Sequence, residues 1–136
     1  MQKLILYIII VGVIVLITLG CIGVSSLKNK DNIEFLKSYG WEVSKTPLET
    51  KEIKIPKEFD EVYKNYNLLQ IEAGLNLLNY RGKTGTRYTY EVLNYPIKTD
   101  EQVRANVIVI DNTPVAGDIM TVSLSGFMHS LYYAGK

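Results

Sequence analysis

Hydrophobic and polar positions divide the chain into two parts. Residues 4–24 form an unbroken apolar run without a charged side chain, and charged residues are frequent in everything that follows. A helix of this length, rising 1.5 Å per residue, crosses the ~30 Å hydrocarbon layer of a membrane. The pattern predicts a membrane anchor over residues 1–24, a short polar linker over residues 25–30 and one small domain over residues 31–136.

Cys21 raises the question of what kind of anchor this is. Thr18-Leu19-Gly20-Cys21 resembles a relaxed form of the sequence before the modified cysteine of bacterial lipoproteins, which makes Cys21 a candidate lipidation site. Against this, Ile22-Gly23-Val24 prolongs the apolar run, and cysteine is ordinary in an apolar helix. A cleavable signal usually has a shorter apolar region. We expect a transmembrane helix, with the lipoprotein signal as the alternative.

The orientation of the anchor is weakly specified by charge. Lys3 precedes the run, and Lys28, Lys30 and Lys37 follow it, so the positive-inside rule does not decide. A very short basic tail followed directly by an apolar run is typical of export. We therefore expect a single-pass protein in the cell membrane with its domain on the extracytoplasmic side.

Two helices are predicted at the start of the domain. The first begins at a capping box formed by Asp31 and Glu34 and ends at Gly40. The second covers residues 57–73 after Pro56, and its apolar positions recur at helical spacing: Phe59, Val62, Tyr63, Tyr66, Leu69 and Ala73.

Alternation of polar and apolar residues predicts the strands. They cover residues 50–56, 87–96, 103–110 and 113–124, with a turn at Asp111-Asn112 and a bulge or a short break near Gly117-Asp118. The fold class is a small α+β domain with two helices and an antiparallel sheet of three to four strands. We expect the second helix, through Val62, Tyr63 and Tyr66, to pack on the sheet face that bears Tyr88, Tyr90, Val107 and Val109.

Composition excludes several classes of function. Lys3 is one of 15 Lys and Arg residues, so the rest of the chain balances 14 basic against 14 acidic residues. A balanced domain has no large field to attract nucleic acid. One cysteine and one histidine exclude an internal disulfide and the common zinc sites. We expect no cofactor and no metal.

Candidate catalytic and binding residues are few, and each has a plainer interpretation. His129 with Ser125, Ser130 and Asp118 suggests a relay, but no nucleophile elbow accompanies them, so we expect no catalytic role. Gly82-Lys83-Thr84 lacks the rest of a phosphate-binding loop. A small basic spot is present in a loop that we expect to be solvated: Arg81, Lys83 and Arg87. Asp60 and Glu61 are carboxylates in the first turn of a helix, where they favour the helix dipole. Five tyrosines could bind carbohydrate or peptide, but we expect them to belong to the hydrophobic core: Tyr63, Tyr66, Tyr88, Tyr90 and Tyr95.

Five segments together resemble a known group. They are YGWEV (39–43), PKEFDEVYKNYNLLQ (56–70), RYTYEVLNYP (87–96), VRANVIVIDNTPVAGDI (103–119) and GFMHSL (126–131). In this order they are similar to an uncharacterised family of small membrane-anchored proteins from Gram-positive bacteria, described as a domain of unknown function. The resemblance implies an anchor followed by one small domain, and it implies no activity and no site residues.

These observations favour a non-enzymatic binding or accessory module of the cell envelope, tethered to a membrane. Its partner would be an envelope polymer or a membrane protein, and nucleic acid is not expected. Two alternatives stay open: an enzyme or enzyme inhibitor whose site is not visible in the sequence, and a membrane-associated domain that faces the cytoplasm.

The nature of the anchor is tested by the intact mass of the protein in the membrane fraction. We expect an unmodified chain of all 136 residues, and the same mass less one sulfur atom for Cys21→Ala. A species that lacks residues 1–20 and carries added acyl mass would contradict the transmembrane helix in favour of the lipoprotein.

Overall fold

The computed structural model describes residues 2–3, 5, 8–9 and 27–134. The chain divides into two compact units, residues 1–30 and residues 31–136. Within the described residues, no helix combines the length and the apolar character that a membrane crossing requires. Most of the expected anchor, including Cys21, lies outside these residues. Membrane anchoring therefore stays a prediction.

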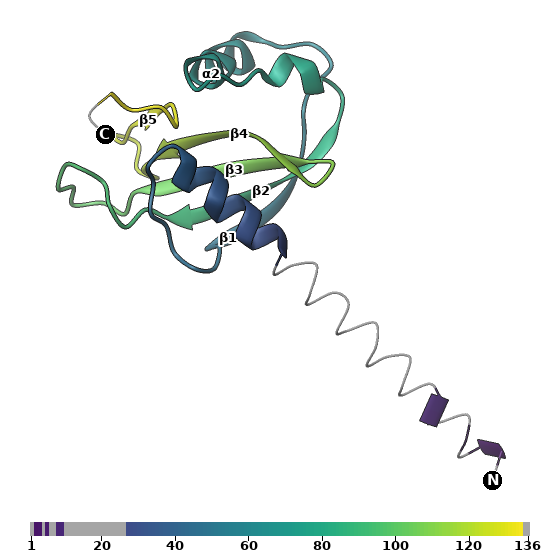
Figure 1. Cartoon of the computed structure of the whole chain (residues 1–136). Helices are drawn as coiled ribbons and strands as arrows, with labels where there is room; N and C mark the ends of the chain where they lie inside the picture. The colour runs from purple at the N-terminus through teal and green to yellow at the C-terminus, as the bar shows by residue number, and fades with distance from the viewer. Residues whose placement is uncertain (1, 4, 6–7, 10–26, 135–136) are drawn as a thin grey trace. The chain divides into compact units, whose positions relative to one another are not determined.

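Residues 31–136 are built around one antiparallel sheet of five strands (Figure 1). The strands follow one another in space as they do in the chain: β1 (Glu49–Lys54), β2 (Thr84–Glu91), β3 (Arg104–Ile110), β4 (Thr113–Met120) and β5 (Met128–His129). One helix covers residues 27–38 and a second, α2, covers Glu61–Glu72. A short 3-10 helix, η1, covers Leu77–Tyr80. The predicted α+β class with two helices is confirmed.

The sheet has one strand more than the three to four that the sequence pattern predicts. The additional strand, β5, contains two residues and pairs only with Ile119 and Met120 of β4. Two residues are too few to show an alternation of polar and apolar positions, so periodicity does not reveal such a strand.

Glycine ends both helices, as predicted. After the first helix, Gly40 has φ +89° and its N–H bonds to the Lys37 carbonyl, while the Trp41 N–H reaches the Leu36 carbonyl at 3.1 Å. This pair of bonds is the Schellman motif, which needs a residue with positive φ. Gly74, with φ +77°, repeats the arrangement after α2. The predicted turn at Asp111-Asn112 is also present, with φ 49° and 61°.

The central strand β3 is buried on both faces, so the sheet has a hydrophobic cluster on each side. The first cluster includes Leu36, Trp41, Tyr90, Val107 and Ile119. The second includes Ile55, Leu77, Ile108 and Ile110, with Phe59 and Tyr66 packed against it. Because side chains alternate along a strand, neighbouring residues of β3 serve opposite clusters.

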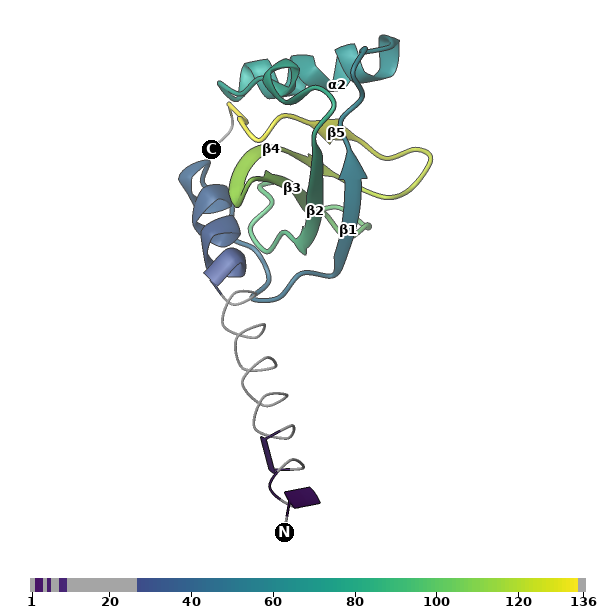
Figure 2. The same cartoon turned by 90° about the vertical axis from the view of Figure 1, so that its right-hand side faces the viewer.

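The expected packing partner of α2 is wrong. The face that bears Tyr88, Tyr90, Val107 and Val109 packs against the helix over residues 27–38 and against Trp41. Helix α2 lies on the other side of the sheet (Figures 1 and 2), next to Ile108 and Asp118. Periodicity identifies the inward side chains of a strand, but a strand buried on both faces has two inward sides, and the sequence does not assign a helix to either.

The irregularity in β4 also differs from the prediction. The register between β3 and β4 shifts opposite Ile108 and Val109, where Ala116 and Pro114 are their partners and Val115 is passed over. Asp118 and Gly117, where the bulge was expected, keep regular pairing with Asn106 and Val107. The apparent slip near Asp118 arises because a polar side chain occupies a buried position there.

The assignment of sheet faces is tested by Val107→Asp. Val107 is 0% exposed, so the variant buries an unpaired carboxylate, and we expect a loss of several kcal/mol in the free energy of unfolding. Val122→Asp is the matched control because Val122 is 62% exposed. Urea denaturation followed by tryptophan fluorescence measures both. A Val107→Asp protein that unfolds at the parent's midpoint would contradict the assigned strand phase.

Candidate functional site

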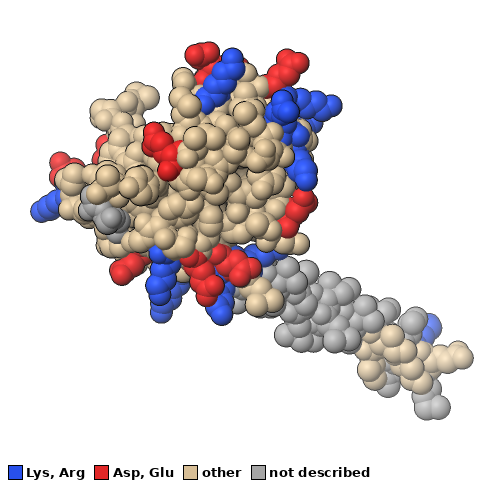
Figure 3. All heavy atoms as spheres, turned by 45° about the horizontal axis from the view of Figure 1, so that its top comes forward, with Lys and Arg blue, Asp and Glu red and all other residues tan. Residues whose placement is uncertain are grey.

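A cleft of about 660 Å³ separates α2 from the sheet, and we call it the α2 cleft. The residues that line it come from α2 and from all five strands. They are Ile53, Val62, Tyr63, Asn65, Tyr66, Leu69, Arg87, Asn106, Ile108, Asp118, Met120 and Met128. Seen from near the α2 side, charged side chains lie mostly toward the margin of the surface (Figure 3). Its volume is typical of a small-molecule site.

The cleft exists because α2 packs in an unusual way. The two residues that the helix buries are polar, Asn67 and Gln70, whereas Val62, Leu68 and Ile71 are 73%, 60% and 50% exposed. Gln70 Oε1 accepts a hydrogen bond of 2.9 Å from the backbone N–H of Gly117 on β4. Polar contacts therefore contribute to holding α2 on the sheet, and the apolar side chains of α2 only partly fill the space beneath it.

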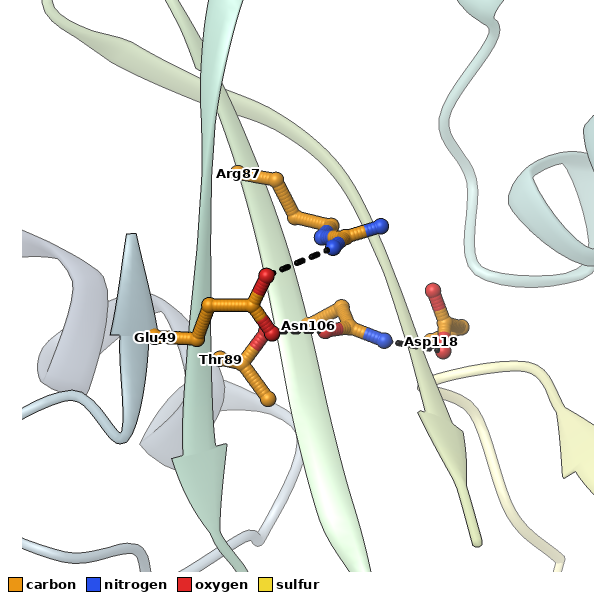
Figure 4. Close-up of polar contacts among 5 residues, drawn as sticks. All are labelled: Glu49, Arg87, Thr89, Asn106 and Asp118. Atoms are coloured by element: carbon orange, nitrogen blue, oxygen red, sulfur yellow. Dashed lines mark hydrogen bonds and ion pairs between the residues drawn. The ribbon is translucent and has the colours of Figure 1, made fainter. Parts of the chain in front are cut away.

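A row of polar side chains from adjacent strands lies on the sheet face toward the cleft, and two of them, Asn106 and Asp118, line it (Figure 4). The register places Thr89 of β2 opposite Asn106 of β3, and Asn106 opposite Asp118 of β4. Directly opposite residues project on the same face, so the three side chains lie side by side. They are 3%, 4% and 2% exposed.

A continuous chain of hydrogen bonds satisfies this row. The Thr89 hydroxyl donates to Asn106 Oδ1 at 2.6 Å, and Asn106 Nδ2 donates to Asp118 Oδ2 at 3.0 Å. The Tyr66 hydroxyl of α2 donates to the other oxygen, Asp118 Oδ1, at 2.6 Å. Buried polar groups are stable only when they are paired in this way. The Tyr66–Asp118 bond also joins α2 to the sheet.

Burial changes the ionisation of the groups at this junction. Loss of solvation raises the pKa of Asp118 above 3.8, although the hydrogen bonds from Tyr66 and Asn106 and the charge of Arg87 act in the opposite direction. Burial and the neighbouring Asp118 raise the pKa of Tyr66 well above 10.0. Tyr66 consequently keeps its proton throughout the neutral range and acts as the donor.

Arg87 is the one member of the floor with an unused polar atom. Its Nη2 lies 3.4 Å from Glu49 Oε1, in an ion pair in which the two side chains are 34% and 50% exposed. Its Nε is buried and has no hydrogen-bond partner in the described part of the chain. Such a donor is rare in a folded protein because an unpaired buried N–H costs free energy.

The residues considered as a relay do not form one in the structure, where His129 and Asp118 lie on opposite faces of the sheet. His129 lies opposite Ile119 in the sheet and so projects on the face away from Asp118. Its Nδ1 donates to the Ser130 carbonyl at 2.7 Å, and its Nε2 accepts from the Tyr95 hydroxyl at 3.1 Å. Both ring nitrogens are therefore engaged in a cluster of aromatic rings, which also contains Trp41, Phe127 and Tyr133.

The other candidates separate in space. Lys83 pairs with Asp111 at 3.1 Å at the surface, whereas Arg87 enters the cleft, so the basic spot with Arg81 does not act as one group. Asp60 caps α2 by accepting the Tyr63 N–H at 2.9 Å. Tyr66, Tyr88, Tyr90 and Tyr95 belong to the two hydrophobic clusters, and Tyr63 lines the cleft. Among the described residues, no group of three or more His, Cys, Asp or Glu could hold a metal.

Thr89, Asn106 and the role of Asp118 are not predicted by the sequence pattern. A usable signal is present in β3, where Asn106 interrupts the apolar run of Ala105 and residues 107–110. A polar residue inside a strand that is buried on both faces requires a partner. The pattern indicates that need, but it does not say which residue of another strand meets it.

These features define a small α+β protein with a five-stranded antiparallel sheet. A cleft lies between the sheet and a helix that is hydrogen-bonded to it. Residues 35–119 match the family model described as a domain of unknown function, DUF4830. The match covers more than half of the chain, so the protein belongs to this family. Neither the comparison with curated proteins nor that with solved structures found a match. The expected membership of an uncharacterised domain family is confirmed.

The contribution of the junction is tested by Tyr66→Phe. The variant leaves a buried carboxylate oxygen without its donor, and we expect a loss of about 1.5–3 kcal/mol in the free energy of unfolding. Tyr63→Phe, one turn earlier on α2, is the control and should change stability by less than about 0.5 kcal/mol. Urea denaturation of both proteins measures this. Equal midpoints for the two variants would show that the Tyr66 hydroxyl does not hold α2.

Proposed function

We propose that this protein is a non-enzymatic binding module of the cell envelope, and that the α2 cleft is its binding site. The observation that carries the proposal is a cleft of about 660 Å³ lined by Arg87, whose buried Nε has no partner among the residues that the structure describes. Apolar walls with a few fixed polar groups are the usual composition of a binding site. The rest of the floor is internally bonded, which gives the site a rigid base.

The envelope location is supported by the sequence. The uncharged run over residues 4–24 is long enough to anchor the chain in a membrane, and its export-like start favours an extracytoplasmic domain. A module held at the outer face of the membrane would bind an envelope polymer or a membrane protein.

Asp118 is the observation that favours an enzyme instead. A buried carboxyl group of raised pKa in a cleft is a frequent property of active sites. However, Tyr66 and Asn106 already occupy its two oxygens, and the side chain is 2% exposed. A carboxyl group in this position holds the structure and does not face a substrate, so binding is the better-supported function.

The proposal is tested on intact cells with Val62→Cys, since Val62 lines the cleft and is 73% exposed. The cells are treated with a membrane-impermeant maleimide that carries a photoactivatable group, and are then illuminated. We expect labelling from outside and a light-dependent adduct with an envelope component. Lys37→Cys, at an exposed position of the helix over residues 27–38, is the control and should be labelled without forming that adduct.

The two parts of the proposal fail separately in this experiment. If neither cysteine is labelled until the membrane is permeabilised, the domain faces the cytoplasm. If both are labelled and Val62→Cys gives no adduct beyond that of Lys37→Cys, the α2 cleft is not the binding site.

A further inference from the structure

The sheet side of the α2 cleft contains one buried polar atom without a partner among the described residues, and it is a donor. Both oxygens of Asp118 accept hydrogen bonds, and Asn106 accepts one from Thr89. Arg87 Nε, by contrast, is a buried donor without a partner among the described residues. A ligand that completes this floor must therefore bring an acceptor to Arg87.

The charges beside Arg87 favour an acceptor that is negatively charged. In the register of β1 and β2, Lys51 lies directly opposite Arg87, and it is on the same face as Ile53, which lines the cleft. Like charges in directly opposite positions repel each other. Two carboxyl groups lie near Arg87: Glu49, half exposed, is 3.4 Å from Nη2, and Asp118 is buried with both oxygens engaged by Tyr66 and Asn106. An anionic group between Lys51 and Arg87 would relieve the repulsion and pair with Arg87 by charge-assisted hydrogen bonds.

The remainder of the cleft suits an aliphatic chain. Leu69 of α2 and Ile108 of β3 face the same space, and two methionines, Met120 and Met128, complete the wall. Methionine adapts its shape to flexible apolar ligands. Met128 is 48% exposed and Val62 is 73% exposed, so the apolar wall continues to the surface and leaves an entrance.

We propose that the α2 cleft binds an anionic amphiphile with a single alkyl chain, whose carboxylate or phosphate head group pairs with Arg87 and Lys51. The alkyl chain lies along Leu69, Ile108 and the two methionines. This inference rests on the proposed binding function and adds the chemical class of the ligand. A carboxylate and a phosphate present the same negatively charged acceptor oxygens to Arg87, so the two head groups are separate arms of the test.

The test uses the full chain in phosphatidylcholine nanodiscs and short, water-soluble probes. Octanoate and octyl phosphate carry both parts of the ligand, 1-octanol carries the chain alone, and acetate and inorganic phosphate carry the anion alone. Calorimetry, corrected with empty nanodiscs, measures each Kd. We expect at least one octyl anion to bind at least about tenfold more tightly than octanol, acetate or phosphate. The tighter octyl anion identifies the head group.

The position of the head group is read from the Arg87 Nε–H resonance in nitrogen-15 spectra, assigned by its loss in Arg87→Lys. Octyl anions should shift this signal, and octanol should not. Arg87→Gln should weaken the octyl anion about tenfold and leave octanol unchanged. Lys51→Gln should weaken it less, and Lys37→Gln, which removes the same charge from an exposed position elsewhere, should have no effect.

Three results would overturn the inference. Octanol that binds as tightly as the octyl anions would show an apolar site without anion recognition. An unchanged Kd in Arg87→Gln would place the head group elsewhere. Tighter binding of a neutral hydrophobic peptide, N-acetyl-leucyl-leucinamide, would assign the cleft to a protein partner. If any of these occurs while Val62→Cys still forms its adduct in cells, the ligand class is wrong and the binding module stands.

Discussion

The hydrogen bond from Tyr66 to Asp118 is the contact on which the arrangement of this domain depends. It spans 2.6 Å between α2 and β4, and together with the bond from Gly117 to Gln70 it holds the helix over the sheet. Apolar burial alone would have pressed α2 onto the sheet and filled the space between them. Because directional polar bonds set the position of α2 instead, Val62, Leu68 and Ile71 stay exposed and the α2 cleft stays open.

The two faces of the sheet have different tasks. On one face, Leu36, Trp41, Val107 and Ile119 belong to an apolar core whose burial stabilises the domain. On the other face, the row from Thr89 to Asp118 places buried polar groups in the centre of the sheet. Such a row contributes less to stability than apolar residues of the same size, but it fixes the side chains around Arg87 in defined positions.

The sequence predicted the parts of the fold that depend on local chemistry. Gly40 and Gly74 end their helices because a left-handed residue is needed there, and Asp111-Asn112 turn the chain for the same reason. The face to which α2 belongs was not predictable in this way. That choice is made by contacts between residues distant in the sequence, such as Tyr66 with Asp118, and no periodicity within α2 encodes them. The cleft was missed because it follows from that choice.

The buried polar residues were also difficult to predict from the sequence, although they are a prominent feature of the structure. The region of Asp118 looked like a break in the alternation of its strand, and the structure shows Asp118 as the partner of Asn106 in one row. Apolar residues of similar volume at both positions would stabilise the domain at lower cost. What the polar row provides is a fixed set of side chains next to Arg87 and the open apolar wall of the cleft.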